Sequence, residues 1–162
     1  MRMLLGPFLL FVLALQPALA QEGNASPADE GIGDASELVF PGEARHKVVY
    51  QLNKADNDYQ EHILFSAGAL LRKYGDDIHI VIVAIGPGIH VLGKKPLRPV
   101  TEMVRQRVES LAQYGVEFHA CGNTMKTLGW TEDDLLPFAK EVEVGAADLM
   151  ELQEEGYAYI SW

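Results

Sequence analysis

Strand-like and helix-like segments alternate from His46 to the C-terminus, and this alternation most restricts what the chain can fold into. A short β-rich run at 48–52 precedes a helical pattern, and an almost continuous apolar run follows at 78–85. Such a run is typical of a strand that helices cover on both faces. Strands that alternate with helices need right-handed crossovers and form a mostly parallel sheet. The sequence therefore predicts an α/β fold over residues 46–162, a three-layer flavodoxin-like domain with a mostly parallel five-stranded sheet.

Periodicity and helix-ending residues place the remaining elements. We expect further strands at 116–120, 142–144 and 157–160, and helices at about 58–74, 100–114 and 146–155. A broken helical stretch is expected at 123–139, interrupted at Gly129 and restarted with Thr131 as N-cap. Asp58 and Glu61 have the spacing of a capping box, so Asp58 is expected to cap the first helix. The Gly86-Pro87-Gly88 segment is interpreted as a turn.

The first twenty residues have the pattern of a secretory signal peptide. Arg2 gives a positive start, residues 4–15 are nearly all apolar, and Ala18-Leu19-Ala20 has the small residues that a signal peptidase recognises. The apolar run is short for a bilayer span. We expect export to the periplasm, cleavage after Ala20 and no membrane attachment afterwards. Residues 21–45 are rich in small and acidic residues, and we expect a flexible leader there.

Charge and cysteine content exclude several classes of function. Lys and Arg total 13 against 23 Asp and Glu, which gives a net charge of −10. A surface this acidic binds phosphate backbones poorly, so we expect no nucleic acid partner. The single cysteine excludes an internal disulfide and a cysteine-rich metal site. The five histidines have no close ligand spacing, and we expect neither a metal nor a cofactor.

The carboxyl ends of the parallel strands are the expected place for a site. Cys121 directly follows a predicted strand and precedes a predicted helix, where backbone N–H groups and the helix dipole favour a thiolate. The alternative is a buried structural cysteine that behaves as a small apolar residue. The residues alone leave both interpretations open.

Other polar positions at this edge of the sheet are candidates for ligand binding. His119 lies two residues before Cys121 and therefore on the same side of the strand. It is a candidate to support the thiolate, and the simpler interpretation is a histidine satisfied within the helix–sheet layer. The candidate ligand-binding residues are Asn53, Gly86, Gly88, Gly122, Asn123 and Thr124.

The segment around the cysteine, Phe118-His119-Ala120-Cys121-Gly122-Asn123-Thr124-Met125, resembles the cysteine segment of the DsrE/DsrF-like sulfur-relay family. The Gly-Pro-Gly at 86–88, the helix start at 145–149 and the closing residues 153–160 support the resemblance. It implies a five-stranded α/β fold, trimers or hexamers, and a cysteine that carries sulfane sulfur as a persulfide. That role falls on Cys121. The best-understood members of the family are cytoplasmic, whereas this chain has an export signal.

Two hypotheses about function follow. The first is a periplasmic sulfur-carrier or sulfurtransferase-like protein that uses Cys121 to pass sulfur from a donor protein to an acceptor protein. The second is a non-catalytic, oligomeric module of the same fold that binds a small ligand, with Cys121 structural. An accessible thiol with a depressed pKa favours the first, whereas tolerance of Cys121→Ser favours the second.

Overall fold

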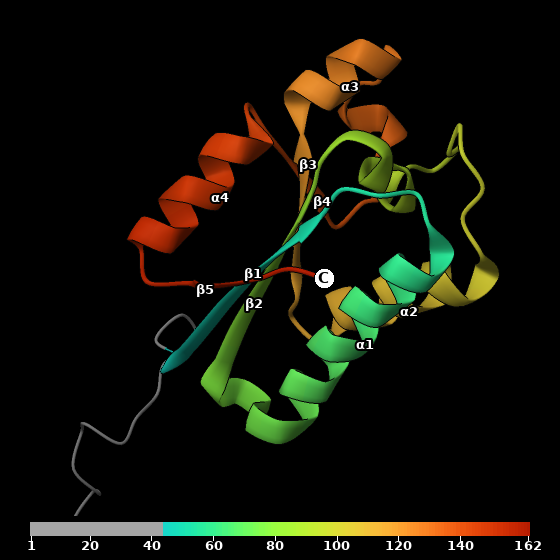
Figure 1. Cartoon of the computed structure of the whole chain (residues 1–162). Coiled ribbons are helices and arrows are strands. Elements are labelled where there is room, and N and C mark those ends of the chain that lie inside the picture. Colours follow the sequence, from blue (N-terminus) through green and yellow to red (C-terminus); the bar gives the residue numbers. More distant parts are fainter. Residues whose placement is uncertain (1–43) are drawn as a thin grey trace, which may run out of the picture. The chain divides into compact units, whose positions relative to one another are not determined.

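A parallel five-stranded sheet with the strand order β4-β3-β2-β1-β5 forms the centre of the protein in the computed structural model, which describes residues 44–162 (Figure 1). The strands are β1 His46–Leu52, β2 Ile78–Ala84, β3 Glu117–Cys121, β4 Ala139–Val142 and β5 Ala158–Ile160. The α-helices are α1 Asn57–Tyr74, α2 Glu102–Gln113, α3 Gly122–Leu128 and α4 Gly145–Glu154. Three short 3-10 helices join them: η2 Gly75–Asp77, η3 Gly86–Leu92 and η4 Glu132–Asp134. The predicted signal peptide and nearly all of the predicted leader lie outside the described residues.

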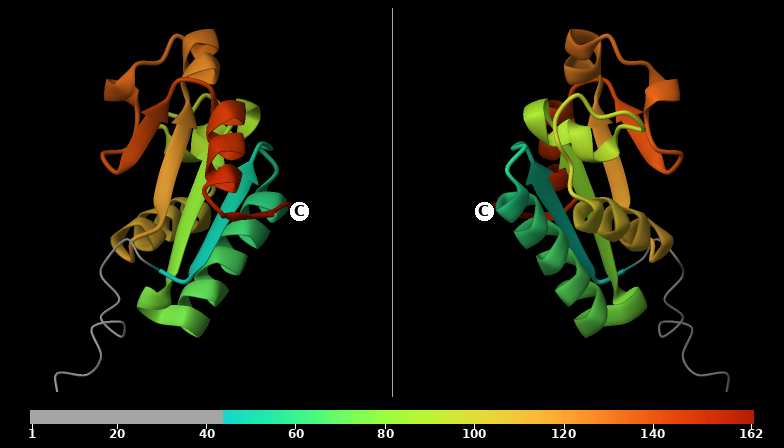
Figure 2. Two further views of the ribbon diagram at one scale, coloured as in Figure 1. Left: turned by 90° about the vertical axis from the view of Figure 1, so that its left-hand side faces the viewer. Right: turned by 90° about the vertical axis from the view of Figure 1, so that its right-hand side faces the viewer.

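The strand order explains which helices lie on which face. From β1 to β4 each step moves in the same direction across the sheet, and right-handed crossovers then place α1 and α2 on one face. The last step returns across the whole sheet to put β5 beside β1, and its crossover places α4 on the opposite face. The two side views show α4 separated by the sheet from α1 and α2 (Figure 2). The predicted three-layer α/β fold with a parallel five-stranded sheet is confirmed.

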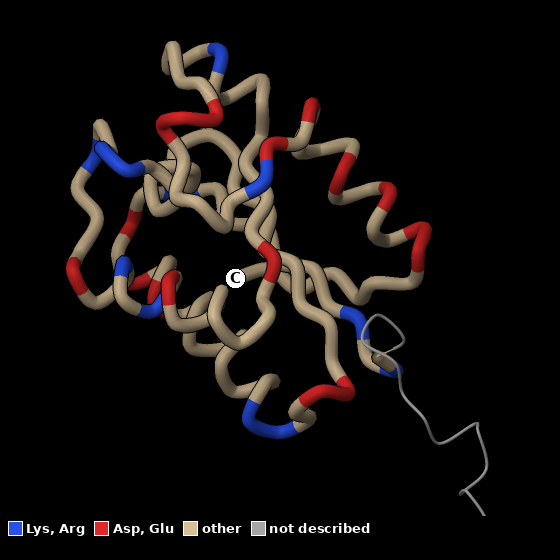
Figure 3. The backbone as a smooth tube through the Cα atoms, turned by 180° about the vertical axis from the view of Figure 1, so that it is seen from behind, with Lys and Arg blue, Asp and Glu red and all other residues tan. Residues whose placement is uncertain are grey.

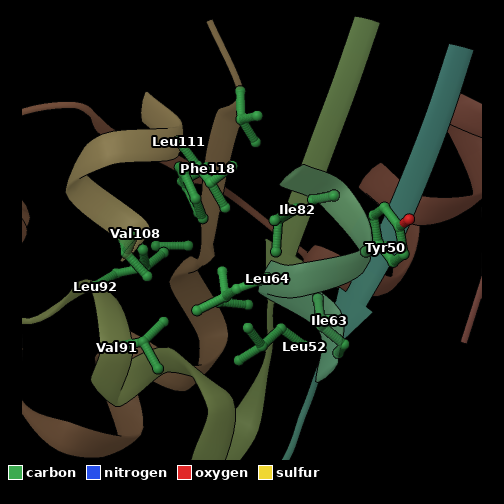
Figure 4. Close-up of a cluster of buried hydrophobic side chains, with 14 of the residues drawn as sticks. Tyr50, Leu52, Ile63, Leu64, Ile82, Val91, Leu92, Val108, Leu111 and Phe118 are labelled. Carbon is green, nitrogen blue, oxygen red and sulfur yellow. The ribbon is translucent and has the colours of Figure 1, made fainter. Parts of the chain in front are cut away.

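The main hydrophobic core lies between the sheet and the pair α1 and α2. The inward side chains of the strands and of both helices are fully buried there, among them Tyr50, Leu64, Ile82, Val108 and Phe118 (Figure 4). The hydroxyl of Tyr50 is paired with that of Ser66 at 2.8 Å, so this large side chain is buried without an unsatisfied polar atom. Burial of this kind contributes about 1.5–3 kcal/mol for each large apolar side chain.

The opposite face of the sheet has a smaller apolar cluster. Leu149 and Leu152 of α4 pack there on Val49, Val81 and Val83. The same face also carries polar side chains, among them His79, Glu117 and His119. The apolar cluster therefore holds the middle and the second half of α4.

Several local predictions were wrong. Asp56, not Asp58, caps α1, because its side chain accepts a hydrogen bond of 2.9 Å from the backbone N–H of Tyr59 and Asp58 already lies in the first turn. The fourth strand is Ala139–Val142 rather than 142–144, because pairing to β3 sets its register and an edge strand tolerates the charged residues it contains. The Gly86-Pro87-Gly88 segment begins η3 instead of forming a simple turn.

The interruption predicted at Gly129 is present. Gly129 ends α3 in the left-handed conformation at φ 70°, and Thr131 caps the next short helix. That helix covers only Glu132–Asp134, so the helical pattern predicted as far as residue 139 does not persist. The chain instead enters β4 at Ala139.

Candidate functional site

Cys121 lies where two neighbouring strands send the chain to opposite faces of the sheet. It is the last residue of β3 and directly precedes α3, whose Met125 packs into the α1–α2 core. The neighbouring strand β4 leads instead to α4 on the other face. Such a switch point, at the carboxyl ends of parallel strands, is where open α/β sheets bind ligands. The sheet thus places Cys121 at the position that the sequence predicted for a site.

The first residue of α4 covers the sulfur of Cys121. The backbone N–H of Gly145 donates a hydrogen bond to Sγ, with 3.3 Å between nitrogen and sulfur. A Cβ atom at position 145 would lie 2.9 Å from the Cβ of Cys121 and 2.9 Å from Cγ1 of Ile85. Glycine is therefore needed at this position so that the backbone can approach the cysteine.

A hydroxyl group reaches the sulfur from the α3 side. The Oγ1 atom of Thr124 accepts a hydrogen bond of 3.0 Å from the backbone N–H of Gly86. Because the hydroxyl oxygen accepts there, its own proton remains free to be donated to Cys121. Thr124 thereby connects the loop after β2 to the thiol at the end of β3.

These donors make the thiol more acidic than an ordinary cysteine. Burial raises the pKa of Cys121, whose exposed fraction is 4%. The N–H of Gly145, the hydroxyl and N–H of Thr124 and the N–H of Asn123 lower the pKa by more, so the net pKa lies below its usual range. The geometry thus favours a thiolate in a place that is largely closed to solvent.

His119 lies on the same face of β3 as Cys121 and belongs to a chain of hydrogen bonds. Its Nδ1 atom is 2.8 Å from Oδ2 of Asp148 in α4, and its Nε2 atom is 3.3 Å from Oε2 of Glu117. The other oxygen of Glu117 is 2.9 Å from Nε2 of His79, whose Nδ1 lies 2.7 Å from the hydroxyl of Tyr157. Burial raises the pKa of Glu117, but the hydrogen bonds from His79 and His119 lower it by more, so its net pKa is depressed.

Glu117, Asp148 and Gly145 are residues that sequence reasoning missed as part of this site. Gly145 marks the predicted start of a helix, but no periodicity shows that this helix begins over the cysteine. Asp148 lies 29 positions from His119, and only the crossover to the α4 face brings the two together. Glu117 was detectable only by its spacing of two residues from His119 on a strand.

The strand order separates the other candidate residues into a group beside Cys121 and a group around β1. Gly86 and Thr124 are joined by a hydrogen bond beside Cys121, and the N–H of Asn123 contributes to the thiol environment. Gly122 lies close to the chain after β4, because a Cβ atom there would lie 3.1 Å from the carbonyl oxygen of Val142 and 3.2 Å from that of Glu143.

Asn53 and Gly88 belong to a different part of the edge. Asn53 follows β1, which lies two strands away from β3, and its side-chain oxygen accepts a hydrogen bond from the hydroxyl of Tyr59 at 3.0 Å. Gly88 packs against β1, since a Cβ atom there would lie 2.0 Å from the carbonyl oxygen of Leu52. Both residues thus serve contacts around β1 rather than the environment of Cys121.

Two cavities on the surface of α1 and α2 lie away from Cys121. The larger has a volume of about 550 Å³ and is lined by α1 and α2, with Phe65, Arg72, Arg107 and Tyr114 among its residues. Within residues 44–162, no group of three or more His, Cys, Asp or Glu side chains is arranged to hold a metal ion. In the same range, no helix has the length and apolar character needed to cross a membrane.

A family model described as the DsrE/DsrF-like family matches residues 43–162. The chain belongs to this family. The match covers all of the residues that the structure describes, including Cys121 and the start of α4 over it. DsrE/DsrF-like proteins are linked to sulfur relay.

Solved structures share the fold. MTH1491 from Methanobacterium thermoautotrophicum, described as a protein of unknown function, is 27% identical with a TM-score of 0.65, over 72% of this chain and 99% of that one. YchN from E. coli is 16% identical with a TM-score of 0.60, over 72% of this chain and 99% of its own. BT1422 from Bacteroides thetaiotaomicron, also of unknown function, is 17% identical with a TM-score of 0.52, over 74% and 97%. No curated protein matches the chain.

Proposed function

We propose that this DsrE/DsrF-like protein is a sulfur carrier that holds sulfane sulfur as a persulfide on Cys121. The observation that carries the proposal is the set of donors around Sγ, above all the N–H of Gly145 at 3.3 Å. Donors that stabilise the thiolate make Cys121 available as the attacking group and also as the leaving group when the sulfur is passed on. Membership of a family linked to sulfur relay supports the same chemistry.

The proposed transfer consists of two exchange steps that need no further reactant. In the first, the Cys121 thiolate attacks the outer sulfur of a donor persulfide or polysulfide. A bond forms between Sγ and that sulfur, the donor's sulfur–sulfur bond breaks, and the donor leaves as a thiolate with the electron pair. In the second, an acceptor thiolate attacks the outer sulfur on Cys121, and the Cys121 thiolate leaves. The sulfane sulfur changes carrier and there is no net oxidation.

Mass spectrometry of the intact protein tests the proposal directly. Wild-type protein treated with polysulfide is expected to gain about 32 Da for each sulfur, and a reductant is expected to remove the gain. Cys121→Ser is the matched control and is expected to gain nothing. An unchanged wild-type mass, or equal gains in Cys121→Ser, would refute the proposal.

We also propose that the protein assembles as a homo-oligomer through the surface of α1 and α2. Phe65 and Tyr114 line the cavity there, and their side chains are 59% and 74% exposed. Large apolar side chains that are exposed together are typical of an interaction surface. The charges of α1 are self-complementary, with Asp58 and Glu61 near its start and Arg72 and Lys73 at its end. Two antiparallel copies of α1 would therefore bring opposite charges together around Phe65.

Light scattering on the full-length mature chain tests this contact. Phe65→Glu is expected to lower the mass of the oligomer, whereas Met150→Glu, at an exposed apolar residue of α4, serves as a control for added charge. An oligomer unaffected by Phe65→Glu, or a wild-type monomer that binds a small apolar molecule in the cavity, would overturn it.

Export is proposed from the sequence of residues 1–20. The mature chain is expected in the periplasmic fraction with Gln21 as its first residue, which N-terminal sequencing determines. Full-length chain in the cytoplasmic fraction would refute export and leave the chemistry of Cys121 to be judged separately.

A further inference from the structure

We propose that His119 and Asp148 are positioning residues that hold the first turn of α4 over Cys121 and thereby limit the accessibility of its thiol. The inference rests on the proposed function in treating Cys121 as the working thiol. It concerns an element, the start of α4, that carries no reactive group of its own.

The start of α4 has little apolar packing to keep it in place. Its buried leucines, Leu149 and Leu152, lie in the middle and second half of the helix, and Ala146 near its start is exposed. The first turn meets the sheet through the backbone of Gly145 on Cys121 and Ile85, and through the side chain of Asp148 on His119. Gly145 and Asp148 are three positions apart and therefore face the same way.

The pair between His119 and Asp148 is well suited to act as this attachment. The side chains are 6% and 15% exposed, and the ring nitrogen and carboxylate oxygen are 2.8 Å apart. A solvated ion pair of surface residues contributes little, whereas a shielded, charge-assisted hydrogen bond is stronger. His119 is itself fixed from the other side by Glu117 of β3, at 3.3 Å.

The groups around His119 connect this attachment to the rest of the sheet face. Asp148 approaches from α4 and Glu117 from β3, while His79 of β2 reaches the second oxygen of Glu117 and Tyr157 reaches His79. Lys140 of β4 is the register partner of His119. A carboxylate only accepts hydrogen bonds, so His119 bonds to both carboxylates only when both of its ring nitrogens carry a proton.

The attachment has two consequences for Cys121 that follow from the geometry. While the first turn is held, the N–H of Gly145 stabilises the thiolate and the backbone of Gly145 covers the sulfur. When the turn is released, the thiol loses that donor, which raises its pKa, and gains solvent contact, which lowers its pKa. Release therefore makes the thiol easier to reach, while its two effects on acidity oppose each other.

The pH dependence of the alkylation rate of folded protein with iodoacetamide separates these effects. The midpoint of the profile gives the thiol pKa, and the plateau at high pH gives the accessibility of the thiolate. We expect the plateau rate to rise severalfold in Asp148→Ala, because the first turn of α4 no longer covers the thiolate.

A purely electrostatic role of Asp148 predicts a change in the midpoint alone. Removing its charge alters the thiol pKa but not the accessibility of the thiolate, and Asn and Ala at position 148 would then act alike. Positioning instead predicts that Asp148→Asn, which keeps an acceptor for His119, retains more of the wild-type profile than Asp148→Ala. Glu151→Ala is the matched control, because Glu151 is an exposed acidic residue of the same acid-rich helix (Figure 3).

An unchanged or lowered plateau rate in folded Asp148→Ala, or identical profiles for Asn and Ala, would overturn the inference. Circular dichroism establishes that each variant is folded. If Asp148→Ala does not fold, Asp148→Asn decides alone, because only positioning raises its plateau rate above that of wild type. Polysulfide loading is measured separately. A shifted alkylation profile without any sulfur uptake would refute the proposed function and leave the positioning role intact.

Discussion

Gly145→Ala is the smallest change that tests how closely α4 approaches Cys121. Gly145 does not have a positive φ, so alanine fits its backbone conformation and the substitution adds only one methyl group. That methyl would lie 2.9 Å from the Cβ of Cys121 and 2.9 Å from Cγ1 of Ile85, where ordinary contacts begin at 3.4 Å. The first turn must therefore move away by at least about half an ångström, counting from ordinary packing distances.

The size of the effect follows from the hydrogen bond that this movement weakens. A hydrogen bond to a charged group contributes about 1.5–3 kcal/mol, which corresponds to about one to two pKa units. We expect loss of part of this bond to raise the pKa of Cys121 by about one unit. Overpacking costs about 1–3 kcal/mol of stability, and alanine in a helix returns about 0.5–1 kcal/mol, so the protein is expected to remain folded.

The assay is the pH profile of Cys121 alkylation together with thermal unfolding. Ala146→Ser is the matched control, because it adds one atom at the next position of α4, which is exposed and faces away from the cysteine. A folded Gly145→Ala protein with the wild-type thiol pKa would refute the reasoning, since it would mean that the Gly145 N–H does not govern the thiol.

Three further predictions concern the thiol and the caps. Thr124→Val is expected to raise the pKa of Cys121 and Thr124→Ser to preserve it, because only the hydroxyl is removed or kept; equal alkylation profiles would contradict this. The pKa of the Cys121 thiol is lower in the folded protein than in the unfolded chain, where it is about 8.5. The difference stabilises the folded state at pH values above the unfolded pKa, and this stabilisation is lost as pH falls through the folded pKa. The free energy of unfolding of wild type relative to Cys121→Ser is therefore expected to increase from neutral pH to about 9, as measured by chemical denaturation. Asp56→Ala is expected to cost about 1 kcal/mol through loss of the α1 cap, whereas Asp58→Ala is expected to cost little; the reverse order would restore the sequence prediction.

Much of the fold could be predicted from local pattern. The apolar run of β2 and the amphipathic spacing in α1 and α2 are properties of consecutive residues, and each corresponds to an element of the structure. The wrong prediction for β4 shows the limit. Val142-Glu143-Val144 has the alternation of a strand, but pairing with β3 selects Ala139–Val142, and Val144 instead precedes α4 as its N-cap.

For the site, the sequence by itself determined that one thiol follows a strand, with a histidine two residues before it on the same face. This information is local, because strand geometry alternates side chains and glycine and threonine after the strand favour a turn into a helix. Only the tertiary structure decided what surrounds that thiol. Gly145 and Asp148 reach β3 because the crossover after β4 returns over the opposite face, and the order of strands depends on the packing of the whole sheet rather than on any short stretch of chain.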